Sequence, residues 1–155
     1  MLEVFVAEEN YALMEDFLKA WTDDARRVKE AFIRLKTSLA LWLGVSFSFH
    51  SRPGVSHSFR AFWPDHGEKE GRLVGLIDIV DDDPENRWLS VCFYSDTVSD
   101  PEEAGNLLPG GLLGEDGYCF DLFEYDEGLL SYLEERIDEA FTNSEQAVKE
   151  QPGGG

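Results

Sequence analysis

The chain has 155 residues, of which 43% are hydrophobic and 13% aromatic, and its formal net charge at pH 7 is −19. This composition predicts one folded domain with a sizeable core and excludes a chain that is disordered throughout. The negative charge repels phosphates and anionic lipids, so we expect no direct binding to nucleic acid and none to a membrane.

Apolar residues recur at steps of three and four from Tyr11 to Trp42, which predicts a long N-terminal helix with one buried stripe. The segment Thr22-Asp23-Asp24 is typical of a helix cap, so the same stretch can also form two helices. The stripe favours packing within this chain, and a homodimer through the N-terminal helix is the alternative.

The next segments predict a β-hairpin. Apolar and polar residues alternate strictly in residues 45–50 and less regularly in residues 57–63. Between them, Ser51-Arg52-Pro53-Gly54 has the residues of a turn. The alternation gives this hairpin one apolar face and one polar face.

A second hairpin follows, and we expect it to be the centre of the sheet. Residues 73–80 and 88–94 are rich in β-branched and aromatic residues, and residues 81–86 between them form a polar turn that contains Pro84. Both strands are apolar at odd and even positions. This pattern predicts that both faces of the central strands are covered.

Residues 95–117 contain two prolines and five glycines, which predicts a long irregular segment. Its four leucines suggest an ordered Ω-like loop that is anchored to the core, with Leu108 and Leu112 buried. Its acidic residues, Asp100 among them, are expected to stay solvated. Residues 118–125 read as a further strand, and Asp126 begins a final helix with an apolar stripe up to Phe141.

The predicted fold class is therefore α+β: a long N-terminal helix, an antiparallel sheet of about five strands built from two hairpins plus one strand, and a C-terminal helix. Residues 1–141 form the predicted single domain. Residues 142–155 are polar and end in Pro-Gly-Gly-Gly, so we expect a flexible tail.

The charge is unevenly distributed along the chain. Residues 1–77 carry 11 acidic and 10 basic side chains, whereas residues 78–155 carry 21 and 3. This asymmetry favours a non-enzymatic acidic domain that binds a basic protein partner, in one version by mimicking nucleic-acid phosphates. The candidate binding residues are the acids of three turns and loops: Asp81, Asp82, Asp83, Glu102, Glu103, Glu115 and Asp116.

The alternative is a small-molecule-binding protein or an enzyme whose pocket lies between the sheet and the 95–117 loop. Asp78 and Asp121 are lone carboxylates among apolar strand residues, so they are the candidate polar groups of this pocket. The sequence contains no phosphate-binding glycine loop, no nucleophile-elbow motif and no zinc-protease motif. We therefore predict no catalytic residue and no cofactor.

Other reactive residue types have plainer interpretations. His50 and His57 flank the first turn and, with His66 or Asp65, would give a zinc site only if folding brings them together. Their spacing fits no standard zinc motif, so we predict no metal. Cys92 and Cys119 have no neighbour in sequence that would lower the pKa of a thiol, which favours buried, unreactive side chains.

The location of the protein is predicted from what the sequence lacks. The longest apolar run, Leu39–Leu43, is far shorter than the roughly 20 residues that span a bilayer. The first ten residues do not resemble a secretory signal. These features predict a cytoplasmic protein with reduced cysteines.

Overall fold

The computed structural model describes residues 4–64 and 71–150. Three helices and six strands occur in this part of the chain, in the order α1 (Glu8–Ala20), α2 (Val28–Leu39), β1 (Ser46–Arg52), β2 (Ser56–Trp63), β3 (Arg72–Val80), β4 (Trp88–Tyr94), β5 (Asn106–Leu112), β6 (Glu115–Leu122) and α3 (Glu127–Glu150). The strands form one antiparallel sheet in the order β1-β2-β3-β4-β6-β5. The predicted α+β fold is confirmed, with six strands instead of about five.

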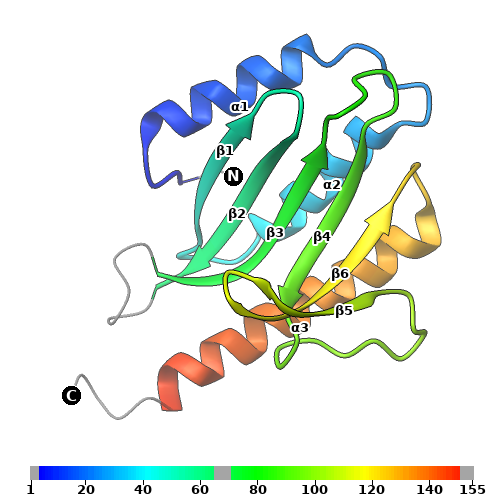
Figure 1. Ribbon diagram of the computed structural model, residues 1–155. Helices are drawn as coiled ribbons and strands as arrows, with labels where there is room; N and C mark the ends of the chain where they lie inside the picture. Colours follow the sequence, from blue (N-terminus) through cyan, green and yellow to red (C-terminus); the bar gives the residue numbers. More distant parts are fainter. Residues whose placement is uncertain (1–3, 65–70, 151–155) are drawn as a thin grey trace.

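The helices all pack against one face of the sheet, where they form the main hydrophobic core (Figure 1). The other face, which we call the open face, carries a smaller apolar cluster made only of strand residues: Phe62, Leu73, Leu76, Cys92, Tyr94, Leu112 and Cys119. The central strands are thus buried on both faces, as predicted. On the open face, however, Leu112 at the end of β5 supplies part of the cover, and no helix contributes to the cluster.

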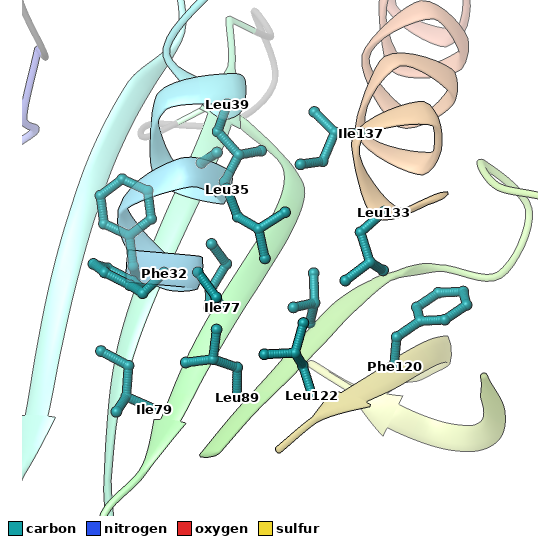
Figure 2. Packing of buried hydrophobic residues seen from close by; sticks show 14 of the residues in the cluster. Phe32, Leu35, Leu39, Ile77, Ile79, Leu89, Phe120, Leu122, Leu133 and Ile137 are labelled. Atoms are coloured by element: carbon teal, nitrogen blue, oxygen red, sulfur yellow. The ribbon is translucent and has the colours of Figure 1, made fainter. Parts of the chain in front are cut away.

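The main core joins α2 and α3 to the middle of the sheet. Figure 2 shows Leu35 of α2 and Leu133 and Ile137 of α3 facing Ile77 and Leu89 of the central strands. All five side chains are completely buried. Because apolar residues recur every three or four positions in both helices, each helix buries one continuous stripe against the sheet.

The N-terminal stretch forms two helices, which is the alternative that the Thr22-Asp23-Asp24 segment allowed. Arg27 adopts a left-handed conformation (φ 57°) just before α2. The carboxylate of Asp24 accepts a hydrogen bond from the backbone N–H of Lys29 (3.0 Å) and so satisfies one free donor of the first helical turn. Met14 and Trp21 from the predicted stripe are buried in this chain's own core. The apolar stripe thus packs within this chain, as the sequence favoured.

The segment predicted as one irregular loop contains β5 and the start of β6. Residues 106–108 pair with residues 117–119, the register shifts across Pro109-Gly110-Gly111, and Leu112 pairs with Glu115. Leu113 and Gly114 both have positive φ angles, 50° and 86°, as in a two-residue hairpin turn. The prediction missed this strand because proline and two glycines lie inside it, which is tolerated at a sheet edge with a bulge.

The anchoring of this region also differs from the prediction. Leu112 is buried as expected, but Leu108 is 43% exposed, so that expectation was wrong. The preceding loop is held instead by Asp100, whose carboxylate accepts hydrogen bonds from the Tyr132 hydroxyl of α3 and from the backbone N–H of Gly105. Burial alone would raise the pKa of Asp100, but these hydrogen bonds outweigh it and hold that pKa below its ordinary value.

The last helix is longer than expected. α3 runs through Glu150 and buries Phe141 and Ser144, whereas the sequence predicted that the folded domain ends at residue 141. The buried stripe of α3 extends to Ser144. The Pro-Gly-Gly-Gly end lies outside the described residues. In the described part of the chain, neither α3 nor another helix has the length and apolar character needed to cross a membrane.

Candidate functional site

A pocket of about 560 Å³ lies on the open face of the sheet, between the β1–β2 hairpin and the β5–β6 hairpin. Its lining residues belong to the six strands and, in the case of Leu113, to the turn that joins β5 to β6. Pockets that hold small molecules usually have volumes of about 300–1,000 Å³. We call this site the open-face pocket.

One side of the pocket is basic. Side chains alternate between the two faces of a strand, so His50 and Arg52 of β1 and Ser58 and Arg60 of β2 point to the open face. Arg60 donates a hydrogen bond from Nε to the Ser58 hydroxyl (3.1 Å). Within residues 4–64 and 71–150, neither arginine forms an ion pair. The sequence predicted that this hairpin has a polar face, which includes Arg52 and Arg60. It did not identify either arginine as a candidate site residue.

A row of directly paired polar residues crosses the open face on five strands: His50, Ser58, Asp78, Ser90 and Asp121. The row thus includes both carboxylates that the sequence proposed as pocket groups. Asp78 lines the pocket, whereas Asp121 is not among the lining residues. The two lie two strand spacings apart, which corresponds to about 9–10 Å.

Both carboxylates have raised pKa values. Burial raises the pKa of Asp78, and a hydrogen bond from Ser58 together with the positive charges of Arg60 and Arg52 only partly opposes this effect. Asp121 is exposed, yet partial burial among the strands raises its pKa as well. In the described ranges no ion pair involves Asp78. The Asp78 carboxylate is therefore partly shielded from water and hydrogen-bonded to Ser58, but no direct ion pair neutralises it within the described residues.

The opposite wall of the pocket is apolar. It consists of Leu108, Leu112 and Leu113 from the β5–β6 hairpin, and Leu76 lies on the floor. Leu108 and Leu113 are 43% and 59% exposed, so they leave apolar surface open to the pocket and to solvent. This wall faces the basic side, and the pocket thus combines positive charge with apolar surface.

The floor of the pocket also contains a disulfide between Cys92 and Cys119. The two residues are directly opposite each other on β4 and β6, with their Cα atoms 4.2 Å apart. The expectation of reduced cysteines was therefore wrong, although both side chains are buried as predicted. The pairing was not visible in the sequence because it depends on the register of two strands that the β5 segment separates.

A second polar network lies on the helix-covered side, at the end of the sheet. The His57 ring bonds the Ser51 hydroxyl through Nδ1 (2.7 Å) and the Asp81 carboxylate through Nε2 (2.8 Å), and it stacks on Phe17 of α1. Arg87 Nε donates to the other carboxylate oxygen of Asp81 (2.6 Å). Burial would raise the pKa of Asp81, but the bonds from Arg87 and His57 outweigh it and lower that pKa.

This network has the residue types of a hydrolytic triad, but its surroundings are those of a structural cluster. His57 and Asp81 are both buried, and Ser51 lines neither the open-face pocket nor the smaller cavity beside Arg87. A nucleophile has to face a space that holds substrate. We therefore interpret the network as the polar link between α1 and the sheet.

The two histidines do not meet. His50 points to the open face and His57 to the helices, because they lie at alternate positions of the paired strands β1 and β2. The further zinc ligands that the sequence offered, Asp65 and His66, lie outside the described residues. Among the residues that the structure describes, no group of three or more histidine, cysteine or carboxylate side chains could hold a metal ion.

The acidic residues proposed to bind a partner fall into separate places. Asp81 is buried in the network with Arg87, while Asp82 and Asp83 are exposed in the turn between β3 and β4. The other two pairs lie beyond the opposite end of β4, Glu102 and Glu103 in the following loop and Glu115 and Asp116 at the start of β6. The seven residues of β4 span roughly 20 Å, so these acids do not form one compact group.

Comparison with known protein families, with curated proteins and with solved structures found no match to this chain.

Proposed function

We propose that the protein binds a small amphipathic anion in the open-face pocket. The observation that carries this proposal is the pairing of Arg52 and Arg60 with an apolar leucine wall across one pocket, in a chain whose net charge is −19. The arginines that line this pocket, Arg52 and Arg60, both belong to the first hairpin. Among the described lining residues, the positive charge of the pocket thus comes from that hairpin.

The arginines supply the anion site. A guanidinium group binds a carboxylate, phosphate or sulfonate through two parallel hydrogen bonds, each stronger than a neutral hydrogen bond. Arg60 uses Nε for Ser58, which orients the group and leaves its two Nη atoms for a ligand. Neither pocket arginine has to give up an ion pair with another described residue when it binds an anion.

The leucines supply the apolar site. A ligand that covers Leu108 and Leu113 removes apolar surface from water, and each square ångström contributes roughly 25 cal/mol. Leu113 also holds a positive φ angle that bulky residues rarely adopt. Its placement at the tip of the hairpin brings an exposed leucine over the rim of the pocket, which supports a role in contacting the ligand.

The other expectations remain predictions. An acidic surface that binds a basic protein has less support than the pocket, since its proposed residues lie at both ends of β4. A cytoplasmic location also stays a prediction, and the Cys92–Cys119 disulfide favours an oxidising compartment instead. A catalytic step is not part of the proposal.

Binding of decanoate, a carboxylate on a ten-carbon apolar chain, tests the proposal by isothermal titration calorimetry. We expect saturable binding to the wild type, and at least tenfold weaker binding to the R52Q/R60Q variant. The reason is that hydrogen bonds to a charged group contribute about 1.5–3 kcal/mol. The change to glutamine keeps most of the side-chain volume and removes the charge.

The matched control is Arg26→Gln, which removes one exposed positive charge from the loop before α2, away from the pocket. This variant should bind decanoate as the wild type does. If decanoate does not bind, or if it binds R52Q/R60Q with unchanged affinity, the proposed function is wrong.

A further inference from the structure

Opposite charges lie side by side in the open-face pocket without neutralising each other. Arg60 on β2 and Asp78 on β3 occupy diagonal positions of paired strands, because Arg60 pairs with Leu76 and Asp78 pairs with Ser58. Residues at diagonal positions are about 7–8 Å apart, within reach of a long side chain. Arg60 nevertheless turns its Nε to Ser58, and no ion pair joins it to Asp78.

This arrangement differs from that of two other shielded carboxylates, which each have an ion-pair partner. Asp81 meets Arg87 at 2.6 Å, and Glu134 meets Arg34 at 2.7 Å. Asp78 has only the hydroxyl of Ser58 and the more distant charges of Arg60 and Arg52. Because a carboxylate that is shielded from water and unpaired is unstable, Asp78 would gain more from a bound cation than an exposed carboxylate would.

We propose that the preferred ligand is a zwitterion of the α-amino acid type with an apolar side chain. Its ammonium group lies beside Asp78, its carboxylate binds Arg60 and Arg52, and its side chain lies along Leu108 and Leu113. The two charges of an α-amino acid are carried on neighbouring carbon atoms, so they can meet two side chains that are diagonal neighbours in a sheet. This inference rests on the proposed function and adds the ammonium group to it.

Asp78 acts in this proposal as a specificity-determining residue. A ligand that has only a carboxylate leaves Asp78 unpaired, whereas a zwitterion neutralises it and adds a charge-assisted hydrogen bond. The site therefore discriminates between two ligands that share the same apolar chain. This discrimination is larger than a change of one methylene group gives, since a half-buried carboxylate is left without an ion-pair partner when the amine is absent.

The test compares 2-aminodecanoate with decanoate, which differ only in the amino group, by isothermal titration calorimetry at pH 7. We expect the wild type to bind 2-aminodecanoate at least tenfold more tightly than decanoate. The Asp78→Asn variant should bind 2-aminodecanoate at least tenfold more weakly than the wild type does, and decanoate within threefold of the wild type. Thermal unfolding of this variant checks that the fold is retained.

Asp121→Asn is the matched control, because Asp121 lies in the same polar row and also has a raised pKa but does not line the pocket. It should leave both affinities unchanged. Equal affinity of the wild type for both ligands, or an Asp78→Asn variant with unchanged affinity for 2-aminodecanoate, would overturn the zwitterion proposal and leave the anion pocket intact. Failure of both ligands to bind would instead overturn the proposed function together with this inference.

Discussion

Replacing Arg87 by methionine is expected to lower the free energy of unfolding by about 3–5 kcal/mol, because it leaves the buried carboxylate of Asp81 without its cation. The two side chains are 14% and 9% exposed, and Arg87 Nε lies 2.6 Å from Asp81 Oδ1. The Arg87 guanidinium group also lies over the rings of Phe17 and Trp21, 5.0 and 5.3 Å from their centroids. Methionine removes these cation–π contacts together with the ion pair, so the expected loss is mainly electrostatic. Unfolding in urea at pH 7 measures it.

In acid, the free energy of unfolding of the same variant should approach that of the wild type. In the wild type the pKa of Asp81 is lowered, so its stabilisation is present above the pKa of the unfolded chain, about 3.9, and is lost as the pH falls below that value. In the variant, burial is opposed only by the bond from His57, so this pKa is higher than in the wild type, and the cost disappears once Asp81 is protonated. The difference between the two proteins should therefore shrink from pH 7 to pH 3.

Arg26→Met is the control for this experiment. Arg26 is exposed and donates one hydrogen bond to Asn86 (3.3 Å), so its replacement should change stability by no more than about 0.5 kcal/mol. An Arg87→Met variant as stable as Arg26→Met at pH 7 would show that the ion pair with Asp81 does not hold this end of the sheet together.

Reduction of the Cys92–Cys119 disulfide is expected to lower the free energy of unfolding by about 2–4 kcal/mol. The bond joins β4 to β6 across a sequence separation of 27 residues, so it restricts the unfolded chain over the whole β5 region. The measurement is urea unfolding with and without a phosphine reductant. The C92S/C119S variant should match the reduced wild type and should not respond to the reductant. Identical unfolding of the wild type in both conditions would contradict this expectation.

The main features of the fold were predictable because they depend on local patterns. The stripe of α2, the alternation in β1 and β2, and the apolar runs of β3 and β4 each match the repeat of one type of secondary structure. β5 was not predictable in this way: six of its seven residues are exposed, and Pro109, Gly110 and Gly111 break its alternation. Its pairing with β6 is decided by the hairpin turn and by Leu112, which no periodic signal marks.

The candidate site was predictable only in part. Asp78 could be singled out because one carboxylate interrupts an apolar strand, and it lines the pocket together with residues 108 and 111–113 of the expected loop. Arg52 and Arg60 were visible only as members of a polar face. Their position opposite the leucines, and the pairing of Cys92 with Cys119, depend on strand order and register, which a single sequence does not reveal.

The most direct test of the open-face pocket is a map of the amide chemical shifts of the ¹⁵N-labelled protein during titration with decanoate. The account predicts that the largest changes occur in residues 50–60, 76–78 and 108–113, the segments that contain most of the lining residues. The changes should be strongly reduced in the R52Q/R60Q variant. Changes concentrated in α1, α2 and α3, or none at saturating decanoate, would contradict it.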